Sequence, residues 1–272
     1  MKAFVCLSVS FSTWNILWSM GALDTSEAQR ELPVMDRSAL AMAKQAGAEE
    51  IIALGWVQAT DESVFRQGLA FGANRAVRIA QPLDEAAATD PLVVASGLAE
   101  AIRKLAGADS APPGAAGEPA KAEPAKAEPA KVLVFCGEAS AEFGRGAVGP
   151  MLAELLGIPV VTSARALEAA GGVLTVQAWE DDGVATFKLD GPAVVTVGAD
   201  APAPGKPNMM AAAKAMRAPI ETIDIEPRPA SLRPRGVTSN EQRRRGKEPV
   251  AGSNLAETVQ VLFGRLRERK VV

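Results

Sequence analysis

The stretch 132–159 reads VLVFCGEASAEFGRGAVGPMLAELLGIP and decides the fold. Its first five residues are apolar, a loop of small residues follows from Gly137, and apolar side chains then recur at helical spacing up to Gly157. This order predicts a strand, a loop and a helix. In an open parallel sheet such a loop lies at the carboxyl end of a strand, where ligands usually bind, and the first amides of the helix favour an anion. The sequence therefore predicts a phosphate-binding loop within 137–149.

The composition excludes several kinds of active site. The chain has 272 residues, 48% of them apolar, and a net charge of −3, which gives no support for general nucleic-acid affinity. It contains no histidine and no tyrosine, so histidine general bases, Ser-His-Asp triads and histidine metal ligands are excluded. The two cysteines, Cys6 and Cys136, lie within apolar runs and are expected to be buried structural thiols rather than metal ligands.

The amino-terminal apolar run is predicted to be a strand rather than a targeting segment. Ser8, Ser10 and Ser12 interrupt the run early, and no clear small-residue cleavage site follows. No other window of about 18 residues is uninterruptedly apolar, so no membrane span is expected. We expect a cytoplasmic protein.

Apolar strands and amphipathic helices alternate through the first half of the chain. Asp61 and Asp90 are expected to cap the second and third of these helices. Such alternation predicts right-handed crossovers and a parallel sheet. The pattern predicts strands at 2–9, 50–55 and 76–79, helices at 35–46, 62–71 and 91–105, and a long mixed connection over 10–32.

The second half adds an antiparallel element. Asp182-Gly183 is a hairpin turn between two alternating runs, 173–177 and 184–189. Asn208 is expected to cap a helix over the following nine residues. The predicted fold class is therefore α/β: a Rossmann-like, mostly parallel sheet with helices on both faces and an appended antiparallel hairpin. Further strands are expected at 160–162, 192–197 and 219–225.

Two segments depart from this pattern, one inserted within the predicted domain at 1–225 and one following that domain. Residues 107–131 hold three copies of Glu-Pro-Ala-Lys and are expected to be an extended, solvated insertion, with a docking segment for a partner as the alternative. Residues 226–272 begin as a basic tail, for which a solvated surface segment and a phosphate or nucleic-acid contact are both open. The tail ends in an amphipathic helix after Asn254, which we expect to dock on another subunit.

Four stretches resemble the β subunit of electron-transfer flavoprotein. Residues 69–76, LAFGANRA, are similar to the family's Leu-Ala-Met-Gly-Ala-Asp-Arg segment, and 179–197 run from an acidic-glycine hairpin to PAVVTV, as in the family. Residues 207–214, PNMMAAAK, resemble Pro-Asn-Ile-Met-Lys-Ala-Lys-Lys, and 148–159 fit the family's helix and following strand. The order and spacing of these stretches extend the resemblance over about 2–225. It implies the adenine nucleotide α-hydrolase-like form of the Rossmann-like fold.

The resemblance implies an electron carrier rather than an enzyme in its own right. Family members pair with an α subunit that holds most of the FAD contacts, and the heterodimer carries electrons from a dehydrogenase donor to a respiratory acceptor. The β subunit commonly buries AMP, or a second FAD. Redox chemistry belongs to the cofactor, so no catalytic side chain is expected. The resemblance places nucleotide-binding residues at Cys6, Leu32, Pro33, Val34, Met35, Trp56, Gly137, Glu138, Ala139, Ser140, Glu142, Gly144, Arg145, Gly146, Ala147 and Val148.

The loop departs from the family where polar side chains would contact the nucleotide. Ala147-Val148 replaces a Gln-Thr pair, Ala139 replaces a Gln, and Leu32 stands where the family has Asn. Each change removes a hydrogen-bond donor or acceptor, at about 1 kcal/mol each, so we expect weakened AMP binding.

Two further departures concern larger side chains. Trp56 stands where a small residue is usual and is expected to fill the adenine space. Lys206, in the partner-recognition loop 200–206, replaces an apolar anchor for dehydrogenases. A dehydrogenase partner unlike the common ones is therefore expected.

Two other classes of function stay open: a non-redox scaffold relative that has lost the nucleotide, and a stand-alone AMP-binding module. A yellow 1:1 complex with an α subunit would favour the electron carrier, and a colourless complex would favour the scaffold. A colourless monomer that binds AMP would favour the module.

Overall fold

The structure is a computed structural model that describes residues 1–11, 17–19, 22–24, 27–107, 132–140, 144–232, 250 and 252–270. Residues 108–131 of the predicted insertion and 233–249 of the basic tail lie outside the described residues. The chain divides into two units, Met1–Ser19 with Leu23–Gly236, and Met20–Ala22 with Val237–Val272. The first unit holds the predicted α/β domain.

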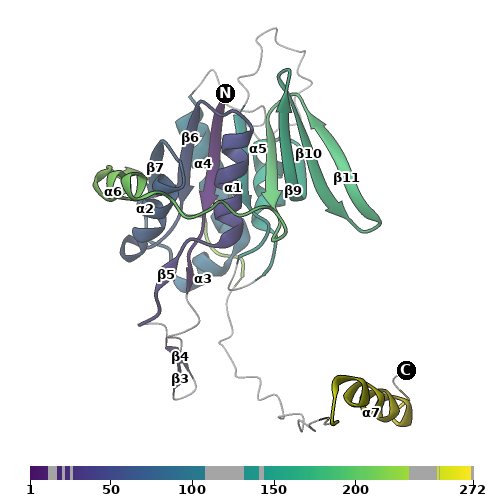
Figure 1. Ribbon diagram of the computed structural model, residues 1–272. Coiled ribbons are helices and arrows are strands. Elements are labelled where there is room, and N and C mark those ends of the chain that lie inside the picture. Colours follow the sequence, from purple (N-terminus) through teal and green to yellow (C-terminus); the bar gives the residue numbers. More distant parts are fainter. Residues whose placement is uncertain are drawn as a thin grey trace. The chain divides into compact units, whose positions relative to one another are not determined.

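One open sheet organises the first unit, with nine strands among the described residues in the order β11-β10-β9-β12-β8-β1-β6-β7-β13 (Figure 1). The mostly parallel α/β sheet is thus confirmed. The appended hairpin is β10 (Val173–Glu180) with β11 (Gly183–Leu189), and the distal part of β9 (Val160–Ala170) extends it. The parallel strands are β1 (Lys2–Leu7), β6 (Glu50–Gly55), β7 (Arg75–Ile79), β8 (Val132–Gly137), β12 (Ala193–Val197) and β13 (Glu221–Ile223).

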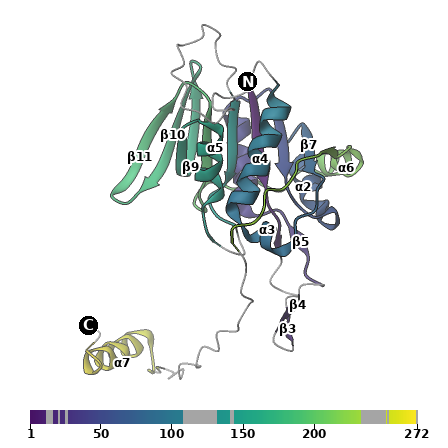
Figure 2. The same cartoon turned by 180° about the vertical axis from the view of Figure 1, so that it is seen from behind.

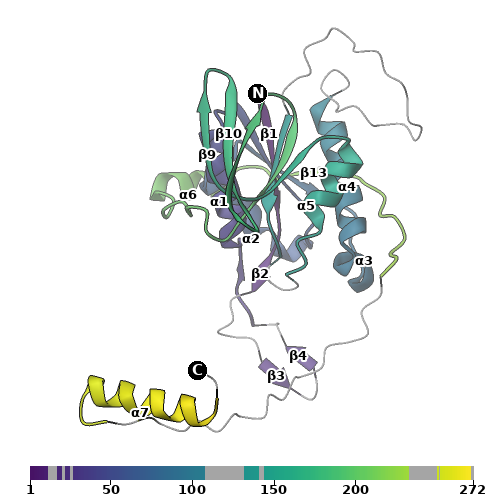
Figure 3. The same cartoon turned by 90° about the vertical axis from the view of Figure 1, so that its right-hand side faces the viewer.

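Helices cover both faces of the parallel part, as predicted. α1 (Val34–Gln45) and α2 (Ser63–Ala70) pack on one face, and α4 (Pro91–Ala106) and α5 (Val148–Leu156) pack on the other (Figures 2 and 3). In β1, Val5 belongs to the apolar cluster of α1 and α2, whereas Phe4 belongs to that of α4 and α5. Side chains alternate across a strand, so a wholly apolar strand needs cover on both faces.

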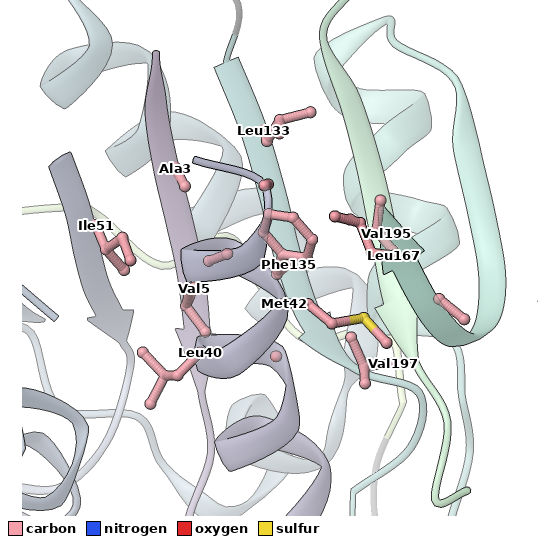
Figure 4. Close-up of a cluster of buried hydrophobic side chains, with 14 of the residues drawn as sticks. Ala3, Val5, Leu40, Met42, Ile51, Leu133, Phe135, Leu167, Val195 and Val197 are labelled. Carbon is pink, nitrogen blue, oxygen red and sulfur yellow. The ribbon is translucent and has the colours of Figure 1, made fainter. Parts of the chain in front are cut away.

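On the α1 side of the sheet, side chains of the helix pack directly on side chains of the strands. Leu40 of α1 lies beside Val5 of β1, and Met42 lies beside Phe135 of β8 and Val197 of β12 (Figure 4). These side chains are all almost completely buried. Helix α1 therefore bridges the central strands of the sheet.

The smaller elements complete the first unit. α6 (Met209–Arg217) packs against α2, and Arg66 of α2 donates hydrogen bonds to the carbonyls of Ala215 and Ala218 at its end. The connection predicted over 10–32 contains short strands: β2 (Ser10–Phe11) pairs with β5 (Arg30–Glu31), and β3 (Leu17–Ser19) with β4 (Ala22–Asp24). The remaining helices are the 3-10 turn Ala59–Asp61 and α3 (Glu85–Thr89).

Local signals predicted three helix caps, and the structure confirms two of them. Asp90 accepts from the Leu92 amide at 2.9 Å, and Asn208 accepts from the amide three residues later at 2.7 Å. The cap predicted at Asp61 is wrong: α2 begins at Ser63 without a side-chain cap. Asp61 instead forms an ion pair with Arg30, because the chain before α1 passes close to it.

The strand order reverses beside β1. The chain leaves β1 toward β6 and β7, and then returns through β8 to the opposite side of β1. In open α/β sheets, ligands bind in the crevice outside the carboxyl ends of the strands at such a reversal. The carboxyl ends of β1 and β8 are therefore the place to look for a site.

The second unit contains helix α7 (Leu255–Glu268). Asn254 caps it by accepting from the Glu257 amide at 3.0 Å, and Glu257 in turn accepts from the Ser253 amide at 2.8 Å. No residue of α7 is buried, and its exposed side chains include Leu262 and Phe263. Among the described residues, no helix has the length and apolar character needed to cross a membrane.

Candidate functional site

A cavity of about 380 Å³ lies at the carboxyl ends of the strands beside the order reversal. The loop between β8 and α5 forms one side of it, and the segments after β1, β6 and β7 and the start of α4 form the rest. Nine of the residues expected to bind a nucleotide line it: Trp56, Gly137, Glu138, Ala139, Ser140, Arg145, Gly146, Ala147 and Val148.

Other expected site residues lie elsewhere. Cys6 is buried within the sheet, and Leu32 is 1% exposed in the core on the α1 side. Pro33 is the N-cap residue of α1, Val34 is 46% exposed, and Met35 is half-buried beside Gly137. None of these five is among the residues that line the cavity. Gly144 is exposed in the loop, and Glu142 lies outside the described residues.

Asp36 holds the strand ends together at the reversal, and sequence reasoning missed it. Its carboxylate is buried in the first turn of α1 and accepts from the amide and hydroxyl of Ser8 at 2.7 and 2.8 Å. It also accepts from the Gly137 amide at 3.2 Å. A Cβ at Gly137 would lie 2.6 Å from the same carboxylate, which explains the glycine. The sequence signal was an acidic residue in the first turn of a helix.

The two cysteines are buried free thiols, as predicted. Cys6 and Cys136 are register partners on the neighbouring strands β1 and β8. Burial first, and then the Asp36 carboxylate, raise the pKa of Cys136 to about 12. Burial also raises the pKa of Cys6 well above its usual value, with Cys136 and Asp36 adding to the effect. Both thiols are therefore protonated, and neither suits nucleophilic chemistry.

Glu138 is fixed by the neighbouring strands. The Ser163 hydroxyl donates to its carboxylate at 2.6 Å, and its amide donates to the Val197 carbonyl at 2.9 Å. Ser163 adopts a left-handed backbone (φ 55°), which is unusual for a residue other than glycine, and its amide donates to the Thr196 hydroxyl at 3.1 Å. The strand β9 bulges here against β12. The bulge is what aims the serine at Glu138.

Arg145 closes the other end of the loop. Its guanidinium donates to the carbonyl of Thr89, the last residue of α3, at 2.8 Å. Gly144 and Gly146 have φ values of 59° and 60°, so each side of Arg145 turns through a conformation that favours glycine. Residues 144–147 thereby keep a defined backbone shape although most of their side chains are small.

Trp56 forms part of the cavity wall next to α4. Its ring nitrogen donates to the Gln81 carbonyl at 2.6 Å. A Cβ at Gly97 of α4 would lie only 1.9 Å from the indole ring, so the missing side chain makes room for Trp56. The cavity extends beside the ring. That the ring takes the place of an adenine stays a prediction.

A phosphorylated nucleotide does not fit the described residues of this cavity well. Its described charged side chains are Arg145, Glu138 and Asp61, and Asp61 is already paired with Arg30. The third residue of α5 is Pro150, which has no N–H to offer an anion. The arrangement suits binding more than acid-base chemistry.

Several wall residues came from parts of the chain that sequence reasoning did not connect to the site. These are Leu7 at the end of β1, Ser8, Val9 and Phe11 after it, Pro82 and Leu83 after β7, and Pro91, Val94 and Leu98 of α4. Only the βαβ topology brings them to the loop. The one signal available was that they follow strand ends or begin a helix.

Comparison with known proteins agrees with this architecture. Residues 116–227 match the family model described as "Electron transfer flavoprotein domain". The chain is 30% identical over 174 residues to the electron transfer flavoprotein subunit beta of Megasphaera elsdenii, which covers 64% of this chain and 57% of that protein. It is 28% identical over 240 residues to the protein of the same name from Thermoanaerobacterium thermosaccharolyticum, which covers 84% of this chain and 81% of that protein. The chain therefore spans less than two thirds of the Megasphaera protein.

Proposed function

Because the chain is similar to electron transfer flavoprotein β subunits over most of its length, we propose that it is a divergent member of that family and that it pairs with an electron transfer flavoprotein α subunit as an electron carrier. The heterodimer would take electrons from a dehydrogenase and pass them to a respiratory acceptor. The observation that carries the proposal is the 240-residue similarity to a β subunit, which includes the β8–α5 loop region. FAD, held mostly by the α subunit, supplies the redox chemistry when bound, and this chain supplies orientation and surface.

We propose that helix α7 binds the α subunit. Leu255, Val259, Leu262 and Phe263 are 80%, 43%, 41% and 51% exposed, and no residue of the helix is buried. An amphipathic helix with a solvent-exposed apolar face is typically buried against another surface. A partner subunit that covers this face gains about 25 cal/mol for each Å² of apolar surface removed from water.

The dehydrogenase contact is proposed for the loop 200–206 and the start of α6. The Trp179 ring nitrogen donates to the Asp200 carboxylate at 2.9 Å, which ties the start of this loop to β10. Lys206 is exposed within it, and Met209 and Met210 follow at 89% and 84% exposure. A cation here favours a donor whose docking surface carries carboxylates.

Co-expression with an α subunit tests the heterodimer. We expect a 1:1 complex by size-exclusion chromatography with light scattering. The double variant Leu262→Glu with Phe263→Glu should weaken the complex at least tenfold, because charges would replace apolar contacts. Gln260→Glu, which adds a charge at an exposed polar position of the same helix, is the matched control and should assemble normally. A complex that the double variant leaves unchanged would refute the role of α7, and failure to assemble at all would refute the heterodimer.

The cavity also supports a second candidate, the non-redox scaffold. Ala139, Ala147 and Val148 line it where the resemblance implies polar or hydroxyl side chains, so fewer side chains are available to hydrogen-bond a nucleotide. A scaffold predicts a 1:1 complex without flavin. The visible spectrum of the same complex therefore separates the two candidates.

A further inference from the structure

The charges around the cavity balance one another. Asp61 is paired with Arg30, whose guanidinium carbon lies 5.4 Å from the centre of the Phe11 ring. Among the described lining residues this leaves Glu138 and Arg145, one charge of each sign. A phosphate dianion is bound by a surplus of positive charge, which these described residues do not provide.

The start of α5 adds little to attract an anion. An anion at a helix N-terminus accepts from the N–H groups of the first turn. In α5, Pro150 has no N–H group, so the amides of Ala147, Val148 and Gly149 are the donors that remain at this end. Gly149 is pressed against β12, since a Cβ there would lie 2.3 Å from the Thr196 methyl group.

The rest of the wall is mostly apolar and includes a fixed aromatic ring. Leu7, Val57 and Leu98 are among the lining residues. The Trp56 indole is held by its hydrogen bond to the Gln81 carbonyl and by its contact with α4, so it keeps one position. A fixed indole offers a surface on which a flat ring can pack without loss of side-chain freedom.

We propose that this cavity binds an uncharged aromatic molecule of nucleoside size, with adenosine as the probe, in preference to the phosphorylated nucleotide. The ring packs against the face of Trp56, in the space beside the indole and not in the place that the indole itself takes, and its polar groups face Ser8, Gln58 and Ser140. The volume of about 380 Å³ lies in the lower part of the range for small-molecule sites, about 300–1,000 Å³. The choice of adenine rests on the proposed function, whereas the preference for an uncharged molecule rests on the lining residues alone.

The test is calorimetric titration of the folded full-length chain with adenosine and with AMP at low salt. We expect adenosine to bind roughly tenfold more tightly than AMP. Glu138→Gln removes one negative charge from the cavity wall but keeps an acceptor for the Ser163 hydroxyl, so it should strengthen AMP binding relative to adenosine binding. Asp182→Asn removes the same charge at the exposed β10–β11 turn and should change neither.

Two results would overturn this inference. One is AMP binding as tight as adenosine binding or tighter, and the other is a folded chain, checked by circular dichroism, that binds neither at millimolar concentration. The proposed electron-carrier role has a separate readout, the flavin colour of the heterodimer. Adenosine binding by a chain whose complex is colourless would support the inference and refute the electron carrier.

Discussion

Replacing Gly97 with alanine should destabilise the protein by forcing Trp56 out of its place. The new Cβ would lie 1.9 Å from one ring carbon and 2.4 Å from another, and neither α4 nor the ring can absorb that overlap without moving. Overpacking of this kind costs about 1–3 kcal/mol, and we place this case at the upper end. Alanine in a helix interior is about 1 kcal/mol better than glycine. The net expected loss is therefore about 2 kcal/mol.

A double-mutant cycle measured by urea unfolding checks this reasoning. In a Trp56→Ala background the clash is gone, so Gly97→Ala should stabilise the protein by about 1 kcal/mol. The sign of the same substitution thus reverses between the two backgrounds. Equal effects in both backgrounds, within about 0.5 kcal/mol, would show that Trp56 does not pack on Gly97 and would refute the described cavity wall.

The remaining predictions concern three buried side chains. Asp90→Asn should cost about 1–2 kcal/mol, because the Asp90 carboxylate accepts from the amides of Ser231 and Leu232 at 2.7 and 3.1 Å, and hydrogen exchange at those two amides should accelerate. Burial opposes ionisation of Asp90, but these backbone hydrogen bonds prevail and lower its pKa below 3.8. The stabilisation that the Asp90 carboxylate provides should therefore be present above its ordinary pKa and be lost as the pH falls through the lowered pKa. The free energy of unfolding of the variant should fall less steeply in acid than that of the unmodified chain. Cys6 and Cys136 should resist a thiol reagent at pH 8 in the native state and react in urea, and rapid native labelling would contradict their burial.

The parallel sheet was predictable because its signals are local. Wholly apolar strands alternate with amphipathic helices, and a cap such as Asp90 acts on amides two or three residues away. Asp61 was mispredicted for the opposite reason, since its partner Arg30 is distant in sequence and is brought near only by the fold. The bulge at Ser163 was likewise invisible, because it depends on pairing with β12.

The candidate site likewise has one wall that the sequence predicted and another that it did not. The loop residues from Gly137 to Ser140 and from Arg145 to Val148 line the cavity, because a loop between a strand and a helix marks a strand end wherever the strand lies. Which residues form the opposite wall depends on the order of the strands in the sheet. That order is set by the tertiary structure. Asp36 could be noticed as acidic in a first helical turn, but not as the acceptor that joins two strand ends.

The visible absorption spectrum of the co-purified complex tests the central claim most directly. The chain would be expressed with an electron transfer flavoprotein α subunit, and the 1:1 complex would be isolated without added flavin. The electron-carrier account predicts a yellow complex with FAD bound, which is bleached by a dehydrogenase in the presence of its substrate. A stable 1:1 complex that is colourless, and stays so after incubation with FAD, would contradict it.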